Sequence, residues 1–222
     1  MLTPARIGRL MELNQRIELT AVVDEPGNAG DLAAAAEAAG KPLRVLIDVD
    51  VGSHRTGVTS PAAALTLANL IGGREGLELG GLQGYAGHVQ HIADYGDRKA
   101  RIESDLQALA QAREALRQAG FEVAVISGGG TGSHRIDAEM GLLTEIQVGS
   151  YVFCDADYDV VGLTGEDKAA ANPVISVHWL SSLRSSKAWR PSGVLRSTPS
   201  SSVQLVEPRC ASNLAIMART AS

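Results

Sequence analysis

The sequence predicts an α/β fold in which helices connect the strands of a parallel β-sheet. Short apolar runs alternate with helix-like segments up to about residue 165, and such alternation indicates helical crossovers between parallel strands. The run Val45-Leu46-Ile47 is apolar on both faces, as in a sheet that helices cover. Polar residues gather directly after the apolar runs, and the carboxyl ends of strands form the active site in barrels and in open parallel sheets alike.

The predicted elements follow one another with short connections. In chain order they are a helix that opens near Thr3-Pro4 and continues through 7–13, a strand at 17–23, a helix at 28–39, a strand at 43–49, a helix at 60–71, a strand at 77–82, a helix at 94–119, a strand at 123–126, a short helix or turn at 136–140 and a strand at 142–147.

Local signals justify the element boundaries. The alanine-rich helix at 28–39 ends at Gly40, and the long amphipathic helix at 94–119 ends at Gly120, because glycine accepts the left-handed conformation that commonly terminates a helix. Pro61 stands at an early helical position, where its missing N–H costs nothing. Glu18 opens the first strand and is expected to be exposed.

Composition and charge exclude several classes of protein. The chain has 222 residues, of which 45% are hydrophobic and 20% charged, as is ordinary for a globular protein. The net charge of −5 argues against general attraction to nucleic acid or to anionic membranes. The sequence has no apolar run of about 18 residues, and its first residues lack the apolar core of a signal peptide. Cys154 and Cys210 indicate neither a disulfide framework nor a zinc site, and we expect a cytoplasmic protein.

Two small-residue turns follow neighbouring strands. The first is Ser127-Gly128-Gly129-Gly130-Thr131-Gly132, and the second is Gly149-Ser150-Tyr151. Turns of this kind expose several backbone N–H groups to one anion, which is how proteins hold a phosphate without lysine. Tight turns also need glycine for their geometry alone, so the alternative is a purely structural turn.

Four motifs in sequence order carry a family resemblance. They are IDVDVGSHRTGV (47–58), GLQGYAGHVQH (81–91), SGGGTGS (127–133) and QVGSYVFCDADY (147–158). Together they resemble the D-threonine aldolase and D-serine dehydratase group of the alanine-racemase-like, fold type III, pyridoxal-phosphate (PLP) enzymes. The resemblance implies a partial (β/α)8 TIM-type barrel, comprising about the last five strands, and hence domains at 1–165 for the barrel and at 166–222 for an irregular tail.

The resemblance also implies a set of site residues. The cofactor-binding residues would be Tyr85, Gly129, Gly130, Thr131, Gly149, Ser150 and Tyr151. Arg55 and His88 would contact the substrate or the cofactor, although Arg55 has the alternative of a structural ion pair with Asp48 or Asp50. His88 and His91 are too few to close a metal site, and no metal ligand is predicted in this chain.

The catalytic lysine of the resembled family is missing from these motifs. PLP enzymes of this kind need a lysine for the internal Schiff base, and the family carries it near the first barrel strand. The lysines here are Lys41, Lys99, Lys168 and Lys187, and none falls in a family motif. We therefore expect a truncated fragment with no catalytic residue of its own, in which PLP binding is weak or absent.

The segment from about Asn172 onward differs from the rest of the chain. It is rich in serine and arginine, and it shows no strand or helix period. The family continues into a β-domain that holds a divalent metal, and nothing here resembles that domain. The segment is interpreted either as a disordered tail or as a frameshifted translation. The second interpretation rests on the serine and arginine excess and on the fact that GC-rich codons can be chosen for residues 187–199 whose neighbouring frame would read as an apolar run.

The functional hypothesis concerns the parent enzyme. It would act on a small D-β-hydroxy amino acid by retro-aldol cleavage or by dehydration, as a homodimer and without nucleic-acid or membrane partners. The chain itself is expected to be inactive alone. The alternatives are a non-catalytic PLP-binding protein and an inert gene fragment.

Overall fold

A computed structural model describes residues 3–150, 158, 161 and 216–219. The elements are, in order, α1 (Pro4–Arg16), β1 (Glu18–Val23), α2 (Pro26–Ala39), β2 (Leu43–Asp48), α3 (Pro61–Gly72), β3 (Leu77–Gly84), the 3₁₀ turn η1 (Gly87–Val89), α4 (Tyr95–Gln118), β4 (Val125–Gly128), α5 (His134–Met140), β5 (Glu145–Ile146) and β6 (Ile216–Arg219).

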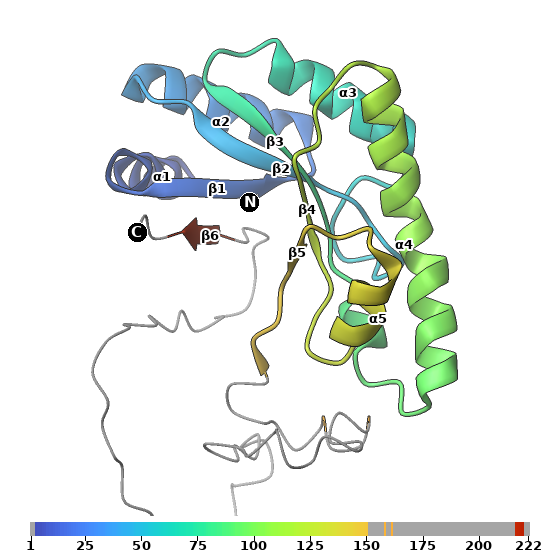
Figure 1. Ribbon diagram of the computed structural model, residues 1–222. Helices are drawn as coiled ribbons and strands as arrows, with labels where there is room; N and C mark the ends of the chain where they lie inside the picture. Colours follow the sequence, from blue (N-terminus) through green and yellow to red (C-terminus); the bar gives the residue numbers. More distant parts are fainter. Residues whose placement is uncertain (1–2, 151–157, 159–160, 162–215, 220–222) are drawn as a thin grey trace, which may run out of the picture.

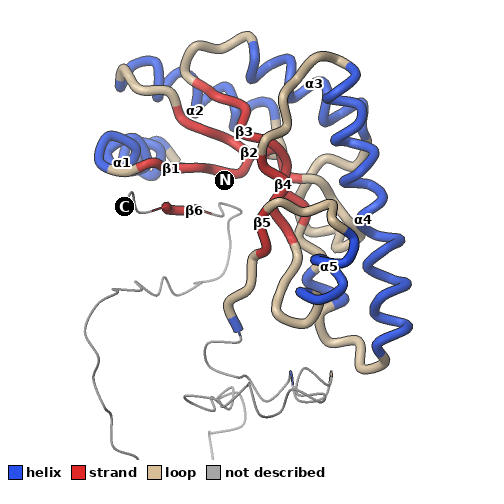
Figure 2. The backbone as a smooth tube through the Cα atoms, in the orientation of Figure 1, coloured by secondary structure: helices blue, strands red, loops and turns tan. Residues whose placement is uncertain are grey.

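The strands form a curled sheet with the order β5-β4-β3-β2-β1-β6. Neighbours from β1 to β5 are parallel, and β6 pairs antiparallel with β1. Figures 1 and 2 show the sheet bending into an incomplete barrel with α2, α3 and α4 along its outer side. The predicted partial α/β barrel is therefore confirmed.

Helix boundaries follow from local capping, as predicted. The hydroxyls of Thr3 and Ser60 accept hydrogen bonds from backbone N–H groups in the first turns of α1 and α3, at 3.4 and 3.2 Å. The Asp94 carboxylate caps α4 in the same way at 2.8 Å. At the other end of α2, Gly40 adopts a left-handed conformation with a φ of 71°.

The last two parallel strands differ from the sequence prediction. β4 begins at Val125 rather than at residue 123, and it continues into the glycine-rich turn as far as Gly128. β5 contains only Glu145–Ile146. The reason lies at Thr144, whose Oγ1 atom accepts the Ile126 backbone N–H at 2.8 Å, so a side chain replaces the backbone acceptor that a longer β5 would have supplied.

Strand β6 is a second difference, because the sequence pattern predicts no strand after residue 172. Ile216–Arg219 pairs with β1, with Ile216 opposite Ala21 and Arg219 opposite Glu18. An edge strand presents unpaired backbone N–H and C=O groups, and a short antiparallel segment satisfies them whatever its side-chain pattern. Within the described residues, β6 therefore covers the free edge of β1 (Figure 1).

The hydrophobic core lies between the sheet and the outer helices. Along β2, Val45 and Ile47 are fully buried in this core, whereas Leu46 and Asp48 project from the opposite, concave face, as the period of two requires. The concave face thus carries a different set of side chains, described below. Among the described residues, no helix is long and apolar enough to span a membrane.

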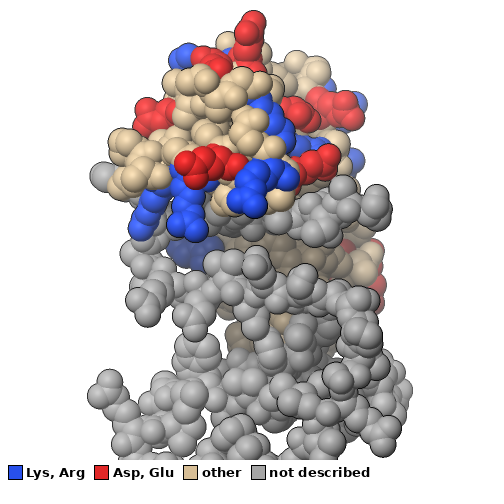
Figure 3. Space-filling view, turned by 90° about the vertical axis from the view of Figure 1, so that its left-hand side faces the viewer, with Lys and Arg blue, Asp and Glu red and all other residues tan. Residues whose placement is uncertain are grey.

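The outer surface over the first helices carries charges of both signs. In the view turned by 90°, acidic and basic side chains lie next to one another on the described part of this face (Figure 3). Because the signs are interspersed, the described residues of this face form no extended basic patch of the kind that binds a polyanion.

Candidate functional site

Loops from four neighbouring strands meet at the carboxyl edge of the curled sheet. The pairing registers set Asp48 at the end of β2 beside Gln83, Gly84 at the end of β3 beside Gly128, and Gly128 beside Ile146. The segments that follow β2, β3, β4 and β5 therefore leave the sheet side by side. All the predicted site residues lie on these segments, although Tyr151 falls outside the described residues.

A chain of polar contacts begins at β2 on the concave face. Thr56 donates its hydroxyl to Asp48 Oδ2 at 2.7 Å, and Gln83 donates from Nε2 to Asp48 Oδ1 at 3.3 Å. Burial raises the pKa of Asp48 above its usual value near 3.8, while the two hydrogen bonds oppose that effect. A carboxyl group poised in this way holds a proton more readily than an exposed one.

The hydrogen bonds that start at Asp48 and Gln83 continue across β4 and β5. Gln147 donates from Nε2 to Gln83 Oε1 at 3.2 Å and to Ser127 Oγ at 3.0 Å. Ser127 in turn donates to Glu145 Oε1 at 2.9 Å. These side chains form a hydrogen-bonded floor below the converging loops, and a polar floor suits a polar ligand.

Arg55 and Tyr85 come from different loops and act on each other electrostatically. Burial raises the pKa of the half-buried Tyr85 hydroxyl, Tyr158 adds to this effect, and the positive charge of Arg55 opposes it. The same guanidinium also opposes, in small part, the rise that burial causes in the pKa of Asp48. Arg55 itself is exposed, and no ion pair of Arg55 is found among the described residues. The rings of Tyr158 and His91 lie in contact at a centroid distance of 4.6 Å, tilted by 40° to each other.

The glycine-rich turn uses part of its own donor capacity. The Gly130 N–H donates to Ser133 Oγ at 3.0 Å, and the Gly132 N–H donates to Gln90 Oε1 at 2.9 Å. Gly129 adopts a left-handed φ of 64°. Thr131 Oγ1 is buried and has no hydrogen-bond partner among the described residues. The turn therefore keeps a buried hydroxyl for an outside acceptor or donor, while the Gly130 N–H is engaged internally.

The second small-residue turn lies next to the first. Gln147 donates its backbone N–H to Gly128 O at 2.8 Å, which fastens the start of this turn to the end of β4. Gly149 is exposed with open space around it, and Ser150 is half-buried. The shared anion site at the two turns stays a prediction.

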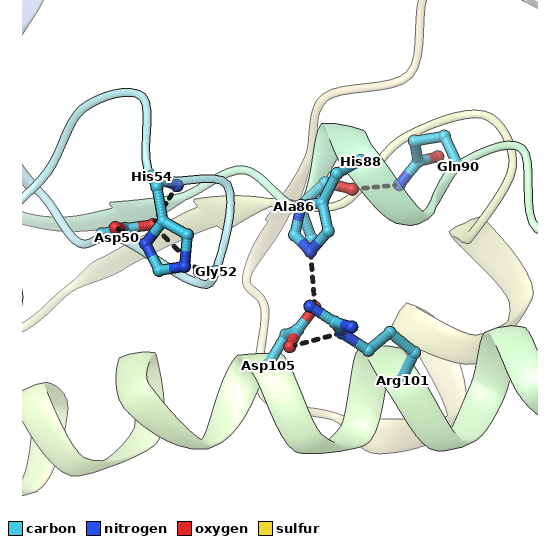
Figure 4. A network of polar contacts seen from close by, with 8 residues as sticks. All are labelled: Asp50, Gly52, His54, Ala86, His88, Gln90, Arg101 and Asp105. Atoms are coloured by element: carbon cyan, nitrogen blue, oxygen red, sulfur yellow. Dashed lines mark hydrogen bonds and ion pairs between the residues drawn. The ribbon is translucent and has the colours of Figure 1, made fainter.

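His88 is held by the outer helix layer. Its Nε2 atom lies 2.7 Å from Asp105 Oδ2 on α4, and Arg101 Nε binds both oxygens of the same carboxylate at 2.9 Å (Figure 4). A Cβ atom on Gly52 would lie 3.2 Å from Asp105 and 3.5 Å from His88 Nε2, so the loop after β2 closes over this pair. The structure thus orients His88 through Asp105.

Asp50 organises the loop after β2. Burial disfavours its ionisation, but hydrogen bonds from the backbone N–H groups of His54 and Gly52 outweigh burial and lower the pKa of Asp50. The His54 ring adds a contact to Asp50 Oδ2 at 3.0 Å. His54 is the only non-glycine described residue with a positive φ, at 50°, and these contacts stabilise that conformation.

Several residues of this site were not selected from the sequence as functional, among them Gln90, Asp105, Ser133 and Asp137. Gln90 and Ser133 lie inside two of the quoted motifs, which was the only available signal. Asp105 lies on an amphipathic helix, where an acidic residue ordinarily faces water. Among the described residues, no group of three His, Cys, Asp or Glu side chains could hold a metal ion.

The site has side chains that suit the phosphate and the ring of PLP, but the described residues place no lysine beside them. The unpartnered Thr131 hydroxyl and the adjacent small-residue turns suit a phosphate group, and Tyr85 and Arg55 suit a ring or a carboxylate. A lysine partner is not found among the described residues at this edge. Lys41 Nζ donates to the carbonyls of Asn14 and Ile17 near the opposite end of the sheet, and Lys99 pairs with Glu139 at 2.9 Å.

Comparison with known proteins agrees with the motifs. Residues 2–157 match the family described as "Alanine racemase, N-terminal domain". The chain is 37% identical over 156 residues to a 3-hydroxy-D-aspartate aldolase of Paracoccus denitrificans (strain Pd 1222), covering 70% of this chain and 40% of that protein. It is 39% identical over 158 residues to a D-threonine aldolase of Arthrobacter sp, again with 70% of this chain covered and 41% of the relative.

Comparison of the structure with solved structures also finds relatives of this kind. The structure of D-threonine aldolase from Filomicrobium marinum matches with a TM-score of 0.70 at 36% sequence identity, covering 72% of this chain and 43% of that one. The chain thus spans about 40% of the length of these relatives. With the motifs, the curled α/β sheet and the family match in agreement, the chain belongs to the alanine racemase N-terminal domain family.

Proposed function

We propose that this chain carries the cofactor-phosphate and ring contacts of a PLP-dependent enzyme that acts on small D-β-hydroxy amino acids. The observation that carries this proposal is the buried Thr131 hydroxyl in the glycine-rich turn at the carboxyl edge of the sheet, which has no partner among the described residues. The named relatives, a D-threonine aldolase and a 3-hydroxy-D-aspartate aldolase, support the substrate class. The parent reaction would be retro-aldol cleavage or dehydration.

The roles follow from the positions of the residues. Thr131, Gly149 and Ser150 would bind the phosphate, and Tyr85 would pack against the ring. Arg55 would bind a carboxylate or the ring from the mouth of the site, because its side chain is exposed beside the half-buried Tyr85. When bound, PLP supplies an electron sink for bond cleavage in the substrate. His88 is turned toward Asp105 and would contribute orientation rather than direct contact.

A second candidate is a PLP-binding protein without catalysis. The positions of Lys41 and Lys99 favour it, since neither described lysine lies at the carboxyl edge of the sheet. Both candidates predict reversible cofactor binding by the turns, and they differ in whether this chain cleaves a substrate.

Titration of the full chain with PLP tests the proposal. Thr131→Val removes the hydroxyl and keeps the shape, so we expect the dissociation constant for PLP to rise about tenfold. Thr66→Val is the matched control, because the Thr66 hydroxyl bonds only the Ala62 carbonyl on the exposed side of α3. Equal affinities for the wild type and Thr131→Val would contradict the phosphate assignment. Release of glycine from D-threonine by the isolated chain would exclude the non-catalytic candidate.

A further inference from the structure

We propose that Gln90 is a positioning residue that braces the glycine-rich turn against the loop after β3, and thereby leaves the Thr131 hydroxyl as the free polar group of the turn. The proposal rests on the proposed function only in taking this turn as the phosphate site. The brace itself is a property of the chain without any ligand.

The Gln90 side chain is saturated with contacts from both loops. It is 1% exposed, and its Nε2 atom donates to Ala86 O at 3.2 Å and to Ser133 Oγ at 2.9 Å. Its Oε1 atom accepts the Gly132 N–H at 2.9 Å. One amide therefore joins the loop after β3 (Figure 4 shows its bond to Ala86) to Gly132 and Ser133, the two residues that follow Thr131. A buried amide of this kind has a strict geometry, because each lost partner leaves an unsatisfied polar group.

Ser133 extends the brace to α5. Its hydroxyl accepts from Gln90 Nε2 and from the Gly130 N–H, and it donates to Asp137 Oδ2 at 2.5 Å. One donor and two acceptors use the full capacity of a hydroxyl group. Asp137 is 2% exposed, and burial raises the pKa of its carboxyl group. The turn is consequently held from two sides by buried side chains.

The brace also explains why the turn is so rich in glycine. A Cβ atom on Gly130 would lie 2.6 Å from Gln90 Oε1, and one on Gly132 would lie 2.1 Å from the Gln90 carbonyl. A Cβ atom on Gly129 would lie 2.3 Å from Asp137 Oδ2. These glycines permit the close approach of Gln90 and Asp137. Phosphate contact is not needed to account for them.

The arrangement assigns different tasks to neighbouring groups in the turn. The N–H groups of Gly130 and Gly132 are engaged by Ser133 and Gln90, whereas Thr131 Oγ1, between them in sequence, has no partner among the described residues. Fixing both flanking amides fixes the backbone that presents Thr131. Gln90 would therefore act on an anion through the turn, without touching it.

Three substitutions in the full chain test the brace. Gln90→Leu removes all three hydrogen bonds. Gln90→Glu keeps the acceptor for Gly132, and it regains a donor only when its carboxyl group is protonated. Gln118→Leu is the matched control, since Gln118 lies on the exposed face of α4 and bonds Glu114 there.

Hydrogen–deuterium exchange of the peptide that contains residues 128–133 is the ligand-free readout. We expect Gln90→Leu to speed exchange in this peptide about tenfold at every pH, while Gln118→Leu leaves it unchanged. At about pH 5 Gln90→Glu should exchange faster than the wild type but more slowly than Gln90→Leu, because its neutral carboxyl group keeps the acceptor for Gly132 and only one of the two donors. At about pH 8 its exchange should speed up further, because burial favours the neutral acid. If Gln90 only filled space, Gln90→Leu, which keeps a side chain of similar size, would exchange like the wild type. Unchanged exchange in Gln90→Leu, or an exchange rate in Gln90→Glu that does not vary with pH relative to wild type, would overturn the proposal.

Titration with PLP separates this inference from the proposed function. If wild type binds PLP, Gln90→Leu should weaken binding about as much as Thr131→Val. If wild type does not bind PLP, the proposed function fails, and the exchange experiment still decides the brace. If Gln90→Leu does not fold, Gln90→Glu measured at about pH 5 decides the proposal, because the loss of one of the two amide donors should still speed exchange relative to the wild type.

Discussion

The imidazole of His88 and the carboxylate of Asp105 meet across two layers of the fold, with Nε2 and Oδ2 2.7 Å apart. His88 lies in the loop after β3, and Asp105 lies on the outer helix α4, where Arg101 holds it from the next turn. Because the carboxylate accepts a hydrogen bond, it selects the histidine tautomer that carries its proton on Nε2.

The His88–Asp105 contact predicts a spectroscopic signature. In the ring ¹H–¹⁵N spectrum, we expect His88 to show a slowly exchanging Nε2 proton, and Asp105→Ala should abolish this signal while costing about 1–2 kcal/mol of unfolding free energy. Glu103→Ala is the control, because Glu103 is an exposed acid on the same helix. An unchanged His88 signal in Asp105→Ala would show that Asp105 does not orient the ring.

Asp48 predicts a specific pH dependence of stability. Burial raises its pKa in the folded state above the usual value near 3.8, so the folded chain keeps a proton that the unfolded chain releases. The contribution of this group to the free energy of unfolding is therefore greatest below the usual pKa and falls as the pH rises through the raised one.

Asp48→Asn should remove the fall in the free energy of unfolding that Asp48 causes as the pH rises. The free energy of unfolding of the variant relative to wild type should increase between about pH 4 and about pH 7, as measured by urea denaturation at each pH. Asp31→Asn, at an exposed position of α2, is the matched control. A difference between Asp48→Asn and wild type that shrinks as the pH rises would reverse the sign of the argument.

Gly81 predicts a backbone requirement at the β3–β4 pairing. Its φ is 146°, and a Cβ atom would lie 1.9 Å from the Val125 carbonyl oxygen. We expect Gly81→Ala to lower the free energy of unfolding by about 3 kcal/mol or more, because both the dihedral and the contact are unfavourable. Gly30→Ala, on α2 with open space around it, should instead raise stability by about 0.5–1 kcal/mol. Urea denaturation of both variants checks the contrast.

The described lysines predict the outcome of cofactor trapping. Incubation with PLP followed by borohydride should leave neither Lys41 nor Lys99 labelled stoichiometrically, because Lys41 is engaged by backbone carbonyls far from the site and Lys99 by Glu139. Lys168 and Lys187 lie outside the described residues. Peptide mapping by mass spectrometry locates any label. A stoichiometric label on one lysine would identify a Schiff-base partner and refute the expectation of a chain without one.

Local chemistry made the helices and most strands predictable. The caps at Thr3, Ser60 and Asp94 and the left-handed Gly40 lie where the sequence placed the helix ends, because each depends on a side chain a few residues from the backbone group that it satisfies. β5 was less predictable, since its length depends on whether the side chain or the backbone of this segment accepts the Ile126 N–H, and Thr144 Oγ1 accepts it.

The candidate site was predictable in outline. Motifs after successive strands had to come together once the sheet was parallel, and the register at Gly84 and Gly128 places them so. The sequence also marked the glycine-rich turn, but it could not tell an anion-binding glycine from one that makes room for a buried side chain. That distinction depends on the position of Gln90.

The sequence by itself determined the order of strands and helices, the parallel sheet, the family and the edge at which polar residues gather, because periodicity, capping and motif spacing are properties of neighbouring residues. Tertiary structure alone decided which atoms meet: Gln90 with Gly132, 42 residues apart, and His88 with Asp105, 17 residues apart. Such contacts require the curl of the sheet and the packing of α4 against it. The free energy of each contact depends on burial that exists only once these layers have assembled.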